Sequence, residues 1–221
     1  MAVELPKDDA LKIKKHILSQ EEAQLLINEA RINDDAMIFA FAVLSGLRLG
    51  EILALTHTDI DIENELINVN KTVGFLTIDG VFKPIVSSPK TENSTRKVPI
   101  MGILKPLLEK HIINEKSKHL RTGTPFSQNS ILFSSTACTY LEGGNVRKRF
   151  KKLLDKLNIP QTSFHALRHS FCSGLSEKGV PLKTASMLMG HSSISITAEL
   201  YTHASDLELK RGIERAEKGY Y

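Results

Sequence analysis

Residues 36–51 read AMIFAFAVLSGLRLGE, and we expect this stretch to decide the fold. From Ala36 to Ser45 the side chains are apolar nearly all round, which is typical of a helix that is buried on every side. Gly46 ends this helix, and Arg48 follows it at once. The sequence therefore predicts a rigid central helix that holds an arginine at its end.

Other patterns surround this helix. Ser19-Gln20-Glu21-Glu22 is a capping-box pattern that opens an earlier helix. Between Asp59 and Ile100 the chain changes to short β-type runs separated by turns. Later helices are expected at the following places: after Gly102 with Pro106 in the first turn, Asn145–Leu157, His165–Lys178, Pro181–Met189, a short one near Tyr201, and Ser205–Glu217. We expect an α+β fold, mainly α-helical, with a small antiparallel β-sheet packed at one side.

The composition indicates one large domain in a reducing compartment. The 221 residues are 41% hydrophobic and show no break in composition, and 29 basic against 25 acidic side chains give a net charge of +4. Cys138 and Cys172 lie far apart and in no metal-ligand spacing. No signal-peptide pattern opens the chain, and the longest apolar run is too short to cross a membrane. We expect a soluble, intracellular protein.

A set of six scattered residues carries the chemistry. They stand in the phrases Gly46–Glu51, Pro89-Lys90-Thr91, His165-Ala166-Leu167-Arg168-His169, Met189–Ser193 and Tyr201-Thr202-His203, and the six are Arg48, Lys90, His165, Arg168, His191 and Tyr201. Two guanidiniums can clamp both non-bridging oxygens of a phosphate. A phenol can attack phosphorus, while lysine and histidine move the protons. This combination suits attack on a phosphodiester without a metal.

These six residues and their surrounding sequence motifs resemble the catalytic domain of the tyrosine recombinases, the phage- and transposon-integrase family. The resemblance holds in residue type, in number and in order along the chain. The resemblance runs from about Ser19 to the C-terminus. It implies an enzyme that cleaves and rejoins DNA strands through a 3′-phosphotyrosine, for integration or excision of a mobile element. It makes Tyr201 the nucleophile, Arg48 and Arg168 the phosphate clamps and Lys90 the donor of a proton to the departing 5′ oxygen. His165 becomes the acid–base imidazole and His191 a hydrogen-bond donor to the phosphate.

Neighbouring residues have supporting or competing interpretations. Glu51 would fix Arg48 or His165 without reacting, and His169 is expected to support the site or its helix. Lys83 and Lys97 are the alternatives to Lys90. The spacing of His165 and His169, with His191 as a third ligand, also fits zinc. Ala166 stands where the metalloprotease motif has its glutamate, and Arg168 would repel a dication, so we expect no metal or other cofactor.

A basic segment lies at residues 146–156. We expect its side chains to follow a nucleic-acid backbone, and the candidates for DNA contact are Arg147, Lys148, Lys151 and Lys152. The alternative is a helix face that is merely solvated.

The resemblance also implies partners and boundaries. Residues 1–18 would be a remnant of an interdomain linker, and residues 19–221 a catalytic domain with a tail at 203–221. The expected partner is double-stranded DNA, with a tetramer on DNA in the full-length protein, a monomer allowed for the isolated domain, and no membrane. The helix Ser205–Glu217 would dock on the next protomer or fold back on its own. Alternative functions are relaxation of DNA as in type IB topoisomerases and a catalytically silent DNA-binding module. The expected location is the bacterial cytoplasm, at the nucleoid.

Overall fold

The computed structural model describes residues 16–88, 95–191 and 193–201. The expectations for Lys90 and for the helix Ser205–Glu217 lie outside these residues. The helices are α1 (Gln20–Ile32), α2 (Met37–Ser45), α3 (Leu49–Ala54), α4 (Leu104–Thr122), α5 (Gly143–Lys156), α6 (His165–Glu177), α7 (Leu182–Met189) and α8 (Ile194–Tyr201). The strands are β1 (Ile60–Asp61), β2 (Leu66–Val69), β3 (Thr72–Ile78), β4 (Val81–Ser87) and β5 (Arg96–Pro99). No helix among the described residues is long and apolar enough to span a membrane.

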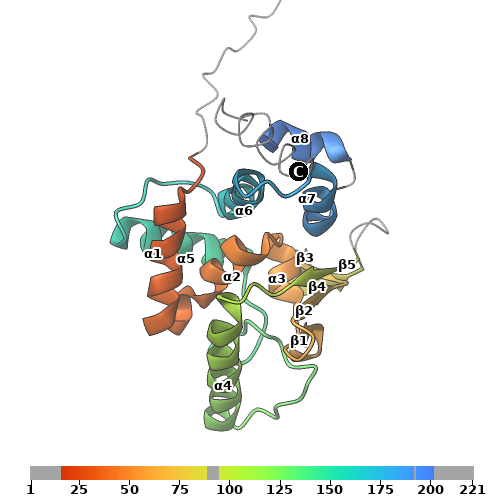
Figure 1. Ribbon diagram of the computed structural model, residues 1–221. Coiled ribbons are helices and arrows are strands. Elements are labelled where there is room, and N and C mark those ends of the chain that lie inside the picture. Colours follow the sequence, from red (N-terminus) through yellow and green to blue (C-terminus); the bar gives the residue numbers. More distant parts are fainter. Residues whose placement is uncertain (1–15, 89–94, 192, 202–221) are drawn as a thin grey trace, which may run out of the picture.

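Helix α2 is the centre of the core, as its sequence predicts. All of its residues are buried, and α1, α4 and α6 pack around it (Figure 1). The ring of Phe39 lies 5.2 Å from that of Phe150 in α5 and 6.1 Å from that of Phe164. A helix packed on every side cannot shift without disturbing its neighbours. What is attached to the end of α2 is therefore held firmly.

The helix-start signals are confirmed. The hydroxyl of Ser19 accepts a hydrogen bond from the backbone N–H of Glu22, and the Glu22 carboxylate accepts one from the backbone N–H of Ser19. Pro106 lies in the first turn of α4, where its missing N–H is not needed. The bounds of α6 and α7 agree with the expected ranges to within one residue at each end. Capping chemistry is local, so the sequence alone reveals it.

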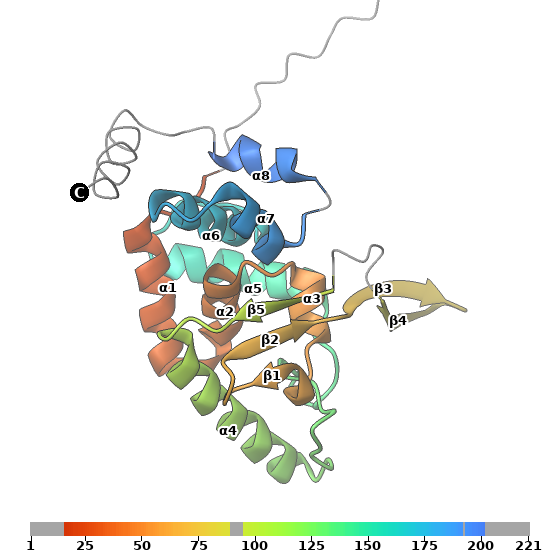
Figure 2. The same ribbon diagram turned by 45° about the vertical axis from the view of Figure 1, so that its right-hand side comes forward.

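The expected single sheet is in fact two antiparallel sheets. Strands β1, β2 and β5 form one sheet in the order β1-β2-β5, and β3 pairs only with β4. The β-type run that begins at Leu66 is divided: β2 ends at Val69 and β3 begins at Thr72, and between them Lys71 forms an ion pair of 2.6 Å with the buried Asp59. The chain leaves the first sheet there, and the β3–β4 hairpin projects from the body of the molecule (Figure 2).

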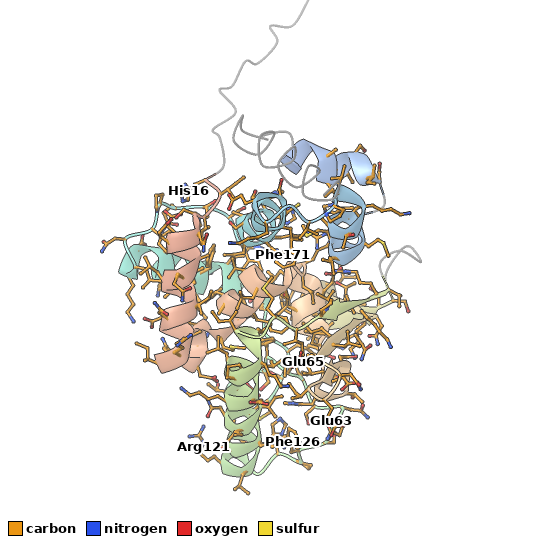
Figure 3. The ribbon with its side chains drawn as sticks, in the orientation of Figure 1. His16, Glu63, Glu65, Arg121, Phe126 and Phe171 are labelled. Atoms are coloured by element: carbon orange, nitrogen blue, oxygen red, sulfur yellow. The ribbon has the colours of Figure 1, made fainter. Side chains whose placement is uncertain are left out.

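Gly46 joins α2 closely to α6. Its φ of +66° ends α2 in the left-handed conformation, which favours glycine. A Cβ at this position would lie 2.3 Å from Cδ1 of Phe171, the α6 residue labelled in Figure 3. The absence of a side chain therefore lets α6 approach the end of α2. This contact brings the backbone of Gly46 within reach of Arg168.

Candidate active site

Arg48 directly precedes α3 and is fixed by Glu51. The Glu51 carboxylate accepts a hydrogen bond of 2.8 Å from the backbone N–H of Arg48 and one of 2.9 Å from its Nη1. The Arg48 side chain is 41% exposed, whereas that of Glu51 is 6% exposed. A buried carboxylate thus orients a guanidinium whose other side faces solvent. Of the two partners considered for Glu51, Arg48 and His165, the hydrogen bonds join it to Arg48.

Arg168 is the most buried of the predicted cations. It lies on α6 with 2% of its surface exposed, donates from Nη1 to the Gly46 carbonyl at 2.7 Å and donates from Nη2 to the Met189 carbonyl. Burial, followed by repulsion from Arg48, lowers the pKa of Arg168 to about 9. The group is still charged at pH 7. Its orientation is set by two backbone carbonyls.

Arg96 is a third arginine of this site, and the sequence interpretation missed it. Its side chain, at the start of β5, is only 6% exposed. It donates from Nη1 and Nη2 to the two carboxylate oxygens of Glu51, at 3.2 and 3.0 Å, and from Nε to the Leu188 carbonyl at 2.8 Å. One signal could have revealed it. Arg96 shares a strand face with the buried Val98, and a cation on a core-facing position requires partners.

The C-terminal turn of α7 binds all three arginines. A helix leaves its last carbonyls without partners within the helix, and these carbonyls carry partial negative charge. The carbonyls of three successive residues, 188, 189 and 190, accept hydrogen bonds from Arg96, Arg168 and Arg48, the last at 3.1 Å. Gly190 has a φ of +62°, and a Cβ there would lie 2.9 Å from Nη1 of Arg96. We refer to Arg48, Arg96 and Arg168 as the arginine cluster.

His191 directly follows this turn. Its Nδ1 lies 2.7 Å from the hydroxyl of Thr197, a fully buried residue of α8. Burial, followed by repulsion from Arg168 and Arg48, lowers the pKa of His191 to about 4. The imidazole is therefore neutral at pH 7. The turn thus brings a neutral imidazole next to the arginine cluster.

The electrostatics of the site favour an anion. Burial by itself raises the pKa of the Glu51 carboxyl, but hydrogen bonding and charge from Arg96, aided by Arg48, outweigh this and hold the pKa below its ordinary value. Glu51 is therefore an anion, and it faces the three guanidiniums of the arginine cluster. The positive excess lies beside the exposed side of Arg48. The chemistry that it can support is the binding of a phosphate or another oxyanion.

The remaining predicted residues are placed unequally. His165 is exposed at the start of α6, and its ring lies 4.5 Å from that of His169, edge to face. Tyr201 is the last residue of α8, whereas Lys90 lies outside the described residues. The alternatives to Lys90, Lys83 on β4 and Lys97 on β5, are both exposed.

The zinc interpretation finds no support in this geometry. Within residues 16–88, 95–191 and 193–201, no group of three histidine, cysteine or acidic side chains could hold a metal ion. The positive excess of the arginine cluster also opposes a dication.

The basic segment lies on α5, with its apolar residues turned inward. Two of its cations form ion pairs of 2.7 Å, Arg149 with Asp35 and Lys156 with Glu29. The four side chains predicted to contact DNA are all exposed: Arg147, Lys148, Lys151 and Lys152. This face can offer charge to a long anion without strict geometry.

Comparison with known proteins places this geometry in a family. Residues 16–208 match the model of the phage integrase family. The chain belongs to this family. A tyrosine recombinase XerC-like protein of Caldanaerobacter subterraneus subsp. tengcongensis is 34% identical over 94% of this chain and 55% of its own length. The transposase of transposon Tn916 of Enterococcus faecalis is 28% identical over 87% of this chain and 49% of its own. The chain thus spans about half the length of these curated relatives.

Solved structures agree with the family assignment. The Tn1549 transposon integrase, determined in complex with transposon right end DNA, superposes with a TM-score of 0.78 at 26% identity, over 94% of this chain and 68% of that one. The XerA recombinase has a TM-score of 0.68 at 22% identity, over 90% of this chain and 63% of that one, which supports the fold alone. The expected α+β fold with its small antiparallel strands is confirmed.

Proposed function

We propose that this chain is the catalytic domain of a site-specific DNA recombinase. It cleaves and rejoins DNA strands through a 3′-phosphotyrosine at Tyr201, for the integration or excision of a mobile element. The observation that carries the proposal is the convergence of Arg48, Arg168 and His191 on one turn, with a positive excess and an exposed guanidinium. The membership of the family and the DNA held by the similar Tn1549 integrase support double-stranded DNA as the substrate.

Arg48 and Arg168 stabilise the transition state. Attack on phosphorus places additional negative charge on the equatorial oxygens, and fixed cations there contribute a large part of the catalysis. Arg48 has the exposed side that can reach a phosphate, and Arg168 contributes its charge from beneath. Both are oriented before DNA arrives, so little reorganisation is needed during the reaction. His191, neutral at pH 7, donates a hydrogen bond to a phosphate oxygen.

The chemical step exchanges one phosphoester for another. The phenol oxygen of Tyr201 attacks the scissile phosphorus, and its proton passes to His165. The bond from phosphorus to the 5′ oxygen breaks, and this oxygen takes a proton from Lys90. A 5′ hydroxyl of the same or another strand then attacks the phosphotyrosine and reverses the step. No water and no nucleotide cofactor enters the balance, because the phosphotyrosine retains the energy of the broken ester.

The assembly that we propose is a tetramer of the full-length protein on two duplexes. An apolar pocket of about 390 Å³ between α1, α2 and α6, with Ile27, Val43 and Phe171 in its wall, offers a surface for the predicted helix Ser205–Glu217. A helix of that length is marginally stable alone in water and requires such a surface. We propose that this helix docks on another copy when DNA is bound. The isolated domain is then a monomer, and the activity belongs to the bacterial cytoplasm, at the nucleoid.

Two other functions share parts of this site. Relaxation of supercoiled DNA, as by a type IB topoisomerase, would use the same nucleophile but not the tetramer. A silent DNA-binding module would use α5 but not the arginine cluster. The burial of Arg168 and its hydrogen bonds to two backbone carbonyls favour an active site over a silent one, because an exposed lysine would bind DNA equally well. The relatives that are named as integrases and transposases favour recombination over relaxation.

Covalent trapping tests the proposal. The protein is incubated with a nicked suicide duplex, which loses a short strand end after cleavage so that rejoining cannot occur. We expect a covalent protein–DNA adduct with the wild-type protein and with Tyr140→Phe. Tyr201→Phe should bind DNA as before but give no adduct. An adduct that survives in Tyr201→Phe, or its absence in the wild type under conditions of full DNA binding, would refute the assignment.

A further inference from the structure

Arg96 is a buried cation to which the proposed reaction assigns no task. It lies on β5, whereas its partners Glu51 and Leu188 lie 45 residues earlier and 92 residues later in the chain. Both of its terminal nitrogens and its Nε donate hydrogen bonds, and its side chain is 6% exposed. All three nitrogens of its guanidinium are thus engaged by protein acceptors. Its effect must pass through the groups that it contacts.

The first of these groups is Glu51, which Arg96 shares with Arg48. Oε1 of Glu51 accepts from Nη1 of Arg48 at 2.9 Å and from Nη1 of Arg96 at 3.2 Å. Oε2 accepts from the backbone N–H of Arg48 at 2.8 Å and from Nη2 of Arg96 at 3.0 Å. Arg96 thus grips both oxygens in the bidentate manner that a planar guanidinium allows. The carboxylate that orients Arg48 is itself oriented by Arg96.

Arg96 also controls the charge of that carboxylate. Burial raises the pKa of Glu51, and Arg96 is the main influence that lowers it again. Without Arg96, only Arg48 and Arg168 would remain as cations beside Glu51, and the pKa of Glu51 would rise. A protonated Glu51 holds Arg48 only weakly, because the charge-assisted hydrogen bond is lost. The position of Arg48 would then depend on pH.

The second group is the C-terminal turn of α7. Arg96 donates to the Leu188 carbonyl, and its guanidinium lies where a Cβ of Gly190 would meet it at 2.9 to 3.0 Å. The turn therefore rests directly on the Arg96 side chain. His191 is the next residue along the chain, so the place of its imidazole depends on this contact. One side chain thus touches the supports of both Arg48 and His191.

We propose that Arg96 is a positioning residue of the phosphate site. It holds the Glu51–Arg48 pair and the turn before His191 in fixed positions relative to each other. The inference rests on the proposed function, because these relative positions matter only if a phosphate is bound and attacked there. It assigns no contact with DNA to Arg96. The strand β5, through Arg96, is part of the active-site scaffold.

The test compares Arg96→Ala and Arg96→Gln with Arg121→Ala, a change of an exposed arginine in the last turn of α4. Single-turnover formation of the covalent adduct is measured at saturating DNA from about pH 5 to about pH 9, where a rise in the pKa of Glu51 would appear. We expect the rate of both Arg96 variants to fall by about tenfold to a hundredfold at the acidic end. We expect it to recover partly as pH rises and Glu51 loses its proton. Arg121→Ala should retain the wild-type profile.

Further variants separate positioning from stability. Glu51→Gln removes the titrating group. The double variant Arg96→Gln/Glu51→Gln should therefore lose the additional fall in rate at acidic pH that Arg96→Gln shows relative to the wild type. Arg96→Lys keeps a charge opposite Glu51 and should restore the wild-type pH profile with an incomplete rate. A pH profile of Arg96→Gln that parallels the wild type would overturn the inference. So would a loss of DNA affinity as large as the loss of rate, since that would make Arg96 a DNA contact.

A failure of the proposed function can be told apart from a failure of this inference. If the wild type gives no adduct, the proposed function fails, whatever the variants do. The carboxyl carbon of Glu51 can then be titrated by NMR with labelled glutamate. A higher pKa in Arg96→Gln than in the wild type supports the role of Arg96, and an unchanged pKa refutes it.

Discussion

Arg168 in α6 and Lys148 in α5 carry the same charge in opposite settings. Arg168 is 2% exposed and donates to two backbone carbonyls, whereas Lys148 lies on the solvent-exposed face of α5. Burying a cation is costly unless it is hydrogen-bonded, and the α7 turn supplies one carbonyl acceptor to each member of the arginine cluster. The difference separates two tasks. A buried, fixed cation can stabilise a charge that develops at one point, and an exposed one can only attract a polyanion.

The largest expected effect is a loss of reaction rate when an arginine of the site is replaced. Arg168→Ala and Arg48→Ala should each slow adduct formation by about 10²-fold or more, because a fixed cation near the developing charge is lost. DNA affinity, measured by fluorescence anisotropy, should change by less than about tenfold. Lys148→Ala is the matched control and should keep the wild-type rate at saturating DNA. Equal losses in affinity and rate would make both arginines ordinary phosphate contacts.

The next largest effect is a loss of DNA affinity when exposed cations of α5 are replaced. Replacing the four cations of α5 that are predicted to contact DNA by glutamine should weaken DNA binding strongly at moderate salt. The slope of log affinity against log salt should fall by about 0.9 for each replaced residue that contacts a phosphate. The adduct rate at saturating DNA should stay within about twofold of the wild type.

Two other cations of α5 serve as the control. Arg149→Gln and Lys156→Gln remove side chains already held by Asp35 and Glu29, so they should change the salt slope less. An unchanged slope in the fourfold variant would remove α5 from the DNA interface.

A smaller effect concerns the charge on two histidines. The pKa of His191 is lowered to about 4 by burial and by Arg168, and the pKa of His57 to about 4 by burial and by His111. A bound phosphate would offset the arginine cluster, so short duplex DNA should raise the pKa of His191 and leave that of His57 unchanged. NMR titration of the imidazole protons measures both. An equal shift of the two would indicate a general change and not a local anion.

The lowered pKa values of His191 and His57 also predict the direction in which the stability of the fold changes as pH falls. In both cases the folded protein disfavours the proton relative to the ordinary pKa of 6.5, so the unfolded chain binds more protons between about pH 4 and pH 6.5. The contribution of each neutral histidine is therefore fully present above pH 6.5 and is lost as pH falls toward 4. Urea unfolding of His57→Leu should show a weaker loss of stability over this range than the wild type. An identical dependence would mean that His57 does not titrate there.

The smallest expected effect is that of a chelator. The proposed chemistry uses arginines where a metal-dependent nuclease would use a cation, so excess chelator should leave adduct formation within about twofold. A loss of tenfold or more, about 1.4 kcal/mol of barrier, that zinc or magnesium restores would revive the histidine–metal interpretation.

The local features of the fold could be predicted, and the long-range ones could not. The buried helix α2, its end at Gly46 and the capping box at Ser19 follow from residues that are close in sequence. The division into two sheets does not, because it depends on which strands pair, and β2 pairs with β5, a strand much later in the sequence. Hydrophobic periodicity cannot reveal a partner of this kind.

The site divides in the same way. Arg48, Arg168 and His191 stand in recognisable phrases, and the structure brings them to one turn. Arg96 stands in no such motif, and its hydrogen bonds to Glu51 and Leu188 reach residues far away in the chain. The roles of Lys90 and Tyr201 remain predictions from the sequence.

The carbonyl anchors at the end of α7 have a consequence for how the protein can change over time. A backbone carbonyl is supplied by every amino acid, so the identity of the side chain at position 188 or 189 does not decide whether Arg96 or Arg168 keeps its acceptor. Exchanges of Leu188 or Met189 for other apolar residues of similar volume should therefore be tolerated. Gly190 has no such freedom, since both its φ of +62° and the nearby guanidinium exclude a side chain. Mutational drift can alter the wall of this site while its charged centre stays in place.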